Sequence, residues 1–85
     1  MTITGDLLKS FHRMDEVKRA LQLIIDHQNE PPLNWAVGYA KHGLSILSED
    51  ELRTQCLYVL NNMTHWRGEV AKEVRATLKS FCGIK

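Results

Sequence analysis

The sequence predicts an all-α domain, built as a compact bundle of four helices in which one long N-terminal helix precedes three shorter ones. Apolar residues recur every three or four positions through most of the chain, which is the spacing of helices with one buried side. Between these stretches stand proline, glycine, serine and asparagine, at positions where helices start or stop. No run of β-branched residues alternates with period two, so we expect no strands.

The first expected helix covers residues 5–28. Thr4 is suited to cap its start, and Asp6 places a negative charge beside the positive end of the helix dipole. Its apolar side is formed by Leu7, Phe11, Met14, Val17, Leu21, Ile24 and Ile25. A break near residues 13–15 is an alternative, because Asp15 is a residue type that caps helices.

The second expected helix runs from about Pro32 to His42. Pro31 cannot continue the first helix, whereas Pro32 suits the first turn of the next one. Gly43 followed by Leu44 is typical of a glycine C-cap with an apolar residue after it. The sequence therefore predicts that the second helix ends at this glycine.

Two apolar stripes, rather than one, follow the second expected helix. One consists of Leu33, Val37, Ala40 and Leu44, and the other of Trp35, Tyr39 and Ile46. At ~100° per residue they point roughly 150–200° apart. An ordinary surface helix has one such stripe. This helix is therefore either covered on both sides by its own chain or presents one apolar face to a partner.

The third expected helix begins with the clearest local signal in the chain, the capping box from Ser48 to Glu51. Its apolar side is formed by Leu52, Cys56, Val59, Leu60 and Met63, and residues 61–62 weaken its end. Thr64 is the expected cap of the fourth helix, which Gly83 followed by Ile84 would terminate. One side of that helix is lined by Trp66, Val70, Val74, Thr77, Leu78 and Phe81.

Length and composition indicate a single globular domain over residues 1–85. Hydrophobic residues make up 44% of the chain and charged residues 25%, which are ordinary proportions for a folded protein. The net charge of +1 lacks the basic excess of nucleic-acid-binding domains, so we do not expect a nucleic-acid partner. No apolar run reaches the ~18–20 residues of a membrane span, and the start of the chain lacks the pattern of a signal peptide.

The two cysteines, Cys56 and Cys82, match no zinc motif, and they are too few for a disulfide framework. We interpret them as reduced thiols that serve as small buried apolar residues. A chain with free thiols is typical of a reducing compartment, so we expect a cytoplasmic protein.

Residue types that carry catalysis or bind metals are present, but they are not arranged for either task. None of the histidines, at positions 12, 27, 42 and 65, stands three or four residues from another. The paired carboxylates at residues 15–16 and 49–51 fall in early helical turns or on solvated faces. The chain has no phosphate-binding glycine loop and no Ser/His/Asp order. We predict that it is not an enzyme and needs no metal or cofactor.

A DNA-associated regulator is the alternative function, based on a corner around residues 40–60 that loosely resembles a helix-turn-helix. Its alanine and glycine stand one residue closer together than is usual for that motif. Arg53, Thr54 and Gln55 would be the base-reading residues. The helix that carries them opens with three acidic residues, whose charge opposes phosphate. A capped corner between two helices is therefore the favoured interpretation.

The function that we predict is a small helical protein–protein interaction module, a regulator, adaptor or assembly factor that binds another protein or itself. The candidate contact residues are Trp35, Tyr39, Trp66 and Arg67, because exposed aromatic and arginine side chains dominate binding interfaces. For Trp66 and Arg67 two alternatives remain. Either both are contact residues, or Trp66 closes one end of the bundle while Arg67 pairs with a carboxylate. Gly68 is a poor residue for the first turn of a helix and is expected to permit a close approach there.

Overall fold

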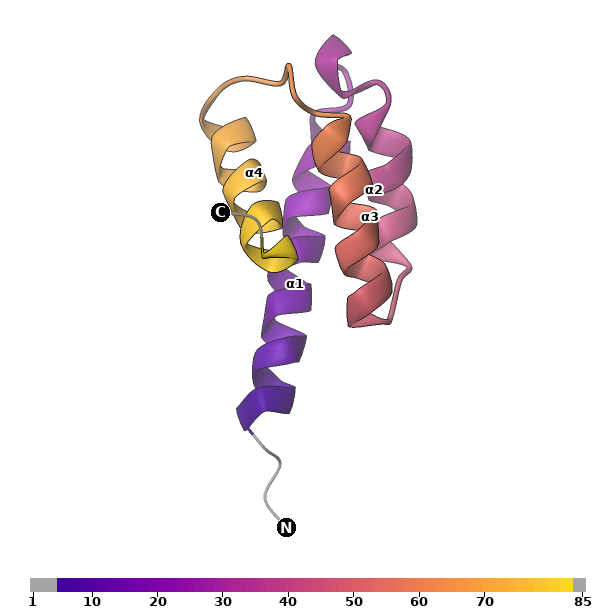
Figure 1. The fold of residues 1–85 in the computed structure, drawn as a ribbon. Coiled ribbons are helices and arrows are strands. Elements are labelled where there is room, and N and C mark those ends of the chain that lie inside the picture. The colour runs from indigo at the N-terminus through magenta and orange to yellow at the C-terminus, as the bar shows by residue number, and fades with distance from the viewer. Residues whose placement is uncertain (1–4, 84–85) are drawn as a thin grey trace.

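Consecutive helices of the chain run in opposite directions (Figure 1). The computed structural model describes residues 5–83, and the side chains from Arg13 onward. Its elements are α1 (Gly5–Asp26), the short 3-10 helix η1 (Pro31–Leu33), α2 (Ala36–Leu44), α3 (Glu49–Asn61) and α4 (Glu69–Cys82). Within residues 5–83 there is no strand. The predicted all-α bundle of four helices is confirmed.

Each helix packs mainly against two others. Both α1 and α3 lie against α2 and α4, whereas α1 and α3 contact each other much less, so these two occupy opposite corners of the bundle. The N-terminal part of α1 extends beyond the ends of the other helices (Figure 1). Among the described helices, none combines the length and the apolar character that crossing a membrane requires.

One continuous cluster of buried apolar side chains fills the space between the helices. Its largest members include Leu21, Ile24, Leu33, Leu52, Met63, Trp66 and Leu78. The buried side of α2 consists of the small residues Ala36, Ala40 and Gly43. Small side chains at a contact permit a short distance between helix axes. The close packing of α2 against α1 and α3 therefore depends on the small side chains on the buried side of α2.

The first helix is continuous through residues 13–15, so the alternative break does not occur. It ends at Asp26, slightly before the predicted end at residue 28. The reason is a change in hydrogen bonding: the backbone N–H of Gln28 donates to the carbonyl of Ile25, and that of Glu30 to the carbonyl of His27. These shorter-range bonds tighten the chain before the prolines. The predicted cap Thr4 lies outside the described residues.

The second predicted helix is divided in two, and the predicted role of Gly43 is wrong. Pro31–Leu33 forms a separate 3-10 turn, and α2 starts only after Trp35. Gly43 lies inside α2 without a positive φ, and the C-cap is Ser45. A Cβ atom added to Gly43 would lie 2.6 Å from Cδ1 of Leu21. The glycine therefore serves the contact between α2 and α1 instead of ending the helix.

The predicted start of α3 is confirmed, because the Ser48 hydroxyl accepts a hydrogen bond from the Glu51 backbone N–H at 3.4 Å. The predicted cap of α4 is wrong. This helix begins at Glu69, and its N-cap is Gly68, with φ of +115°, instead of Thr64. At the other end Gly83 adopts the left-handed conformation, with φ of +76°, as a glycine cap requires. Ile84 lies outside the described residues.

The segment between α3 and α4 is an extended loop because Trp66 inserts into the core from its middle. The guanidinium of Arg75, on α4, donates to the carbonyl oxygen of Met63 at 3.1 Å and to that of Trp66 at 2.8 Å. These two hydrogen bonds attach the loop to α4. After the loop, the positive φ of Gly68 allows the chain to turn into α4. If α4 started at Thr64, the segment between α3 and α4 would be too short to form the loop from which Trp66 enters the core.

Candidate functional site

The two apolar stripes predicted around the second helix have different surroundings in the structure. Of the first stripe, Leu33 in η1 and Ala40 in α2 are fully buried, and Val37 and Leu44 in α2 are partly buried against the core. On the other stripe, Trp35 is 78% exposed and Tyr39 is 40% exposed. Ile46 lies beyond the end of α2 and is buried. Trp35, at the N-cap of α2, is therefore largely exposed, and Tyr39, on the outer side of α2, is partly exposed.

Helix α3 contributes a third aromatic side chain to the same surface. Tyr58 is 49% exposed, and its ring centroid lies 5.7 Å from that of Tyr39. Gln55 links the two helices beneath these rings, because its side-chain amide donates to the Tyr39 carbonyl oxygen at 2.9 Å. This bond fixes α2 relative to α3 and so fixes the spacing of the rings.

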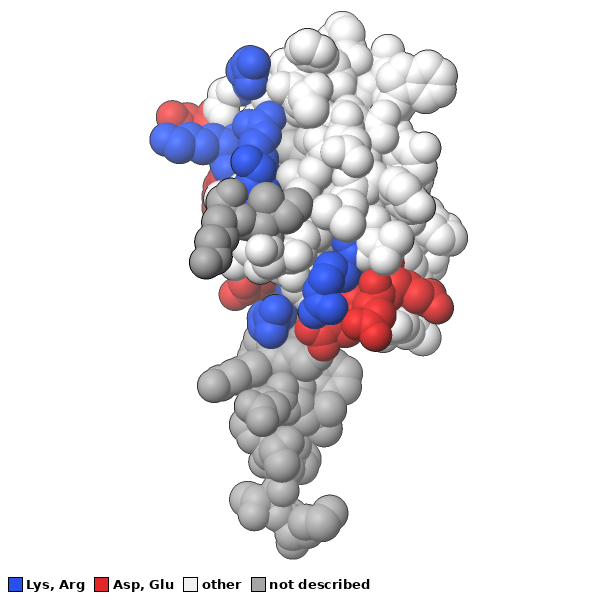
Figure 2. Space-filling model, in the orientation of Figure 1, with Lys and Arg blue, Asp and Glu red and all other residues white. Residues whose placement is uncertain are grey.

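Between α2 and α3 lies an open hollow of about 490 Å³. We call the surface around it the aromatic face. Its seven lining residues are Asn34, Trp35, Gly38, Tyr39, His42, Gln55 and Tyr58. The set includes no lysine, arginine, aspartate or glutamate. Figure 2 shows that the surface over α2 and α3 is mostly uncharged, and that charged side chains gather over α4 and around the start of α3.

Gly38 lies in the middle of the aromatic face, on the exposed side of α2. A Cβ atom at this position would meet nothing within 4 Å. Its φ is not positive, so neither backbone conformation nor internal packing requires a glycine here. Glycine inside a helix costs roughly 0.5–1 kcal/mol relative to alanine. Gly38 leaves helix backbone open to solvent between aromatic neighbours, in contrast to the buried Gly43.

The other two candidate contact residues do not line the hollow of this face. Trp66 is 2% exposed; its indole N–H donates to the Glu30 carboxylate at 3.1 Å, and its ring lies 5.7 Å from that of His27. Trp66 thus closes one end of the bundle, as one of the two interpretations expected. Arg67 is exposed and donates to the Thr64 carbonyl oxygen at 3.3 Å. Among the described side chains it contacts no carboxylate.

Tyr58 is the member of the face that the sequence analysis missed. It stands outside the apolar stripe that was assigned to the third helix, next to Leu57, which is also exposed. The reasoning that identified Trp35 and Tyr39, apolar residues on the side of a helix opposite its buried stripe, applies equally to Tyr58. The pairing of Tyr58 with Tyr39 depends on how α2 and α3 pack, which no local pattern encodes.

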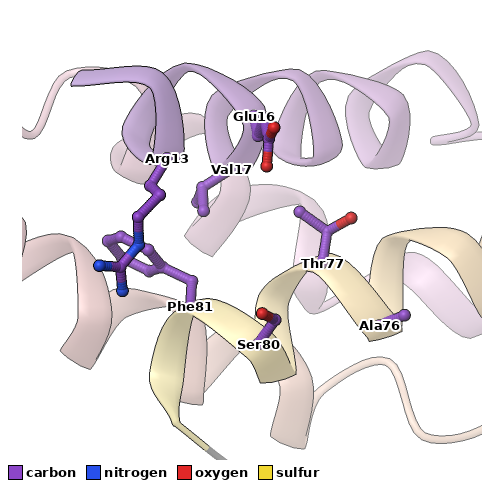
Figure 3. Close-up of a pocket in the computed structure, with 7 residues that line it drawn as sticks. All are labelled: Arg13, Glu16, Val17, Ala76, Thr77, Ser80 and Phe81. Atoms are coloured by element: carbon purple, nitrogen blue, oxygen red, sulfur yellow. The ribbon is translucent and has the colours of Figure 1, made fainter. Parts of the chain in front are cut away.

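A second hollow, of about 280 Å³, lies between α1 and α4 (Figure 3). The guanidinium carbon of Arg13 lies 5.8 Å from the Phe81 ring centroid, and that of Arg53 lies 5.6 Å from it. The Thr77 hydroxyl donates back to the Glu73 carbonyl oxygen within α4. Cations against a ring stabilise its packing. The two arginines therefore stabilise the position of Phe81, and among the described residues no polar group around this hollow forms the nucleophile–base contact of a catalytic site.

The cysteines lie close together, although they are 26 positions apart in the sequence. Both are free; Cys56 is buried in α3, and Cys82, at the end of α4, donates its thiol to the Arg53 carbonyl oxygen at 3.4 Å. Burial, together with the neighbouring Cys82, raises the pKa of the Cys56 thiol to about 12. Burial also raises the pKa of Cys82, against the opposing effect of the Arg53 charge. Thiols with raised pKa values are poor nucleophiles at neutral pH, because little of the reactive thiolate is present.

The corner that resembled a helix-turn-helix does not leave its base-reading residues free. Arg53 forms ion pairs with Glu49 and Asp50, each at 3.1 Å. Gln55 is buried and bound to the α2 backbone, and the Thr54 hydroxyl donates to a carbonyl oxygen of its own helix. In addition, α2 and α3 lie side by side in Figure 1, whereas the helices of that motif cross steeply.

Within the described residues, no group of histidine, cysteine and acidic side chains is arranged to hold a metal ion.

Comparisons with known proteins identify no family: no protein-family model, no curated protein and no solved structure matches this chain.

Proposed function

We propose that this chain is a protein–protein interaction module whose docking surface is the aromatic face of α2 and α3. The observation that carries the proposal is the 78% exposure of Trp35 beside an uncharged hollow lined by two tyrosines. Large apolar side chains exposed together on a small monomer mark interaction sites more often than those scattered singly. Tryptophan and tyrosine are also the residue types that contribute most when an interface forms.

The composition of the face fits a surface that is exposed to water in the free chain and buried when a partner binds. The tyrosine hydroxyls and the His42 imidazole offer hydrogen-bonding groups at the edges of the rings. Interfaces typically have an aromatic centre, depleted of charge, inside a polar rim. None of the acidic residues at the start of α3 or the basic residues of α4 lines the hollow.

A catalytic role has less support, because no side chain of the aromatic face has a nucleophile–base contact among the described residues. We therefore propose a binding role without catalysis. We also propose a cytoplasmic location, which both free cysteines fit.

The test compares capture of partners by the parent chain and by Trp35→Ala. A matched control is Leu47→Ala, because Leu47 is 87% exposed but does not line the hollow. We expect a partner from the native host to bind the parent and the Leu47→Ala variant, and to be lost with Trp35→Ala. If Trp35→Ala binds the same proteins as the parent to the same extent, the aromatic face is not the docking surface.

A further inference from the structure

We propose that the occupant of the aromatic face is a second copy of this chain, in an isologous dimer in which α2 crosses its symmetry mate near Gly38. This inference rests on the proposed function, since it names the partner of the same surface. In an isologous dimer the same patch of both copies forms the interface, so the patch must be complementary to itself. Three properties of the face meet this condition.

The first property is shape. Trp35 projects from the face, and the hollow of about 490 Å³ lies directly beside it. A projection and a hollow on one face allow each copy to insert its indole into the hollow of the other. Trp35, Gly38, Tyr39 and His42 stand at positions i, i+3, i+4 and i+7, so they follow one side of α2.

The second property is the open backbone at Gly38. Helices that cross at a glycine approach more closely than the usual 8–10 Å between axes, because no Cβ separates them. Among the described residues, no atom lies within 4 Å of the position that a Cβ of Gly38 would occupy. A crossing centred on this residue places each glycine opposite its counterpart and leaves the aromatic side chains on either side to pack against the other copy.

The third property is charge. The residues lining the hollow include no lysine, arginine, aspartate or glutamate, so two copies meet there without repulsion between like charges. The whole chain has a net charge of only +1, which also opposes self-association very little. A strongly charged partner, such as a nucleic acid or an acidic peptide, would find no complement on this surface.

The available area fits a weak dimer. A fully buried tryptophan or tyrosine removes about 150–250 Å² from water, so the exposed fractions of Trp35, Tyr39 and Tyr58 correspond to roughly 350 Å² of aromatic surface per copy. A standard interface buries about 800 Å² per partner. The aromatic side chains thus supply somewhat under half of that area, and the remaining lining residues supply part of the rest. We expect dissociation in the micromolar range or weaker.

Analytical ultracentrifugation of the full chain, from about 1 μM to about 1 mM, tests the dimer. The parent and Leu47→Ala are expected to associate reversibly into dimers. Trp35→Ala is expected to weaken dimerisation by at least about 10-fold. Gly38→Ala gives a signature that a structural defect cannot imitate: its dimer should be weaker, while its melting temperature under monomeric conditions should rise.

The outcomes separate this inference from the proposed function. A parent that remains monomeric at every concentration overturns the dimer, as does a dimer that neither Trp35→Ala nor Gly38→Ala weakens. In the first case, loss of a host partner with Trp35→Ala would still support the aromatic face as a docking surface. If Trp35→Ala changes neither self-association nor partner capture, both proposals fail together. Circular dichroism of each variant verifies that the bundle is folded.

Discussion

The indole N–H of Trp66 donates a hydrogen bond to the carboxylate of Glu30 at 3.1 Å, which joins the loop before α4 to the turn after α1. The two residues are 36 positions apart in the sequence. Trp66 thereby combines a buried ring with a satisfied polar group, which is the usual condition for burying tryptophan. This contact closes the end of the bundle at which the long helix stops.

Replacing Glu30 by alanine should lower the free energy of unfolding by about 1–3 kcal/mol, because it leaves the buried indole N–H without its acceptor. Glu30→Gln keeps an acceptor oxygen at the same position, so this control should be destabilised less. Urea denaturation followed by circular dichroism measures both variants. Equal destabilisation by alanine and glutamine would show that the loss comes from the carboxylate charge, because glutamine keeps both the acceptor oxygen and the size of the side chain.

The two glycines of α2 should respond in opposite directions to the same substitution. Gly43→Ala should lower the free energy of unfolding by about 1–3 kcal/mol, because the new Cβ crowds the fully buried Leu21. Gly38→Ala should raise it by about 0.5–1 kcal/mol, because its Cβ would meet no other described residue within 4 Å. Denaturant melts at low protein concentration compare the pair. A neutral Gly43→Ala would mean that Leu21 shifts without cost.

Ser48→Ala should lower the free energy of unfolding by about 0.5–2 kcal/mol, because the backbone N–H of Glu51 loses its acceptor. Ser48→Asp is the matched control, since aspartate is an equally good N-cap and adds a favourable charge at this end of the helix. Thermal and denaturant melts provide the measurement. A midpoint that does not move with alanine would contradict a stabilising role for this cap.

Stability should decline as the pH rises above 9, the ordinary pKa of cysteine, toward the raised pKa of about 12 for Cys56. In this interval the unfolded chain releases the thiol proton and the folded chain retains it, so alkaline pH favours unfolding. Cys56→Ala should show a shallower decline than the parent. Denaturant melts at pH values below and above 9 test this, and identical slopes for the two proteins would mean that Cys56 does not contribute.

The parts of the fold that sequence could predict are those controlled by neighbours along the chain. A serine three residues before a glutamate satisfies the start of α3, and a glycine after α4 adopts the left-handed conformation that ends it. Both signals act over one helical turn. Gly43 shows where local signals fail. A glycine near the end of a helix predicted a C-cap, but in the structure Gly43 makes room for Leu21, which is distant in sequence.

The candidate site was predictable to a similar extent. The helical spacing of Trp35 and Tyr39 indicated a second apolar side of the helix, and the structure leaves both side chains exposed. Periodicity could not decide that Trp66 is buried instead, because its environment comes from Glu30, His27 and Arg75, on other parts of the chain. Tyr58 joined the face only through the packing of α3 against α2.

The contrast between the two tryptophans gives this chain a pair of independent optical probes. Trp66, enclosed and hydrogen-bonded, should emit at short wavelength and resist quenching by acrylamide, so its signal follows unfolding. Trp35 is in contact with water and should emit at longer wavelength and be quenched readily, so its signal follows whatever covers α2. If two copies associate through the aromatic face as proposed, raising the concentration of the chain should shift the emission of Trp35 while that of Trp66 stays fixed.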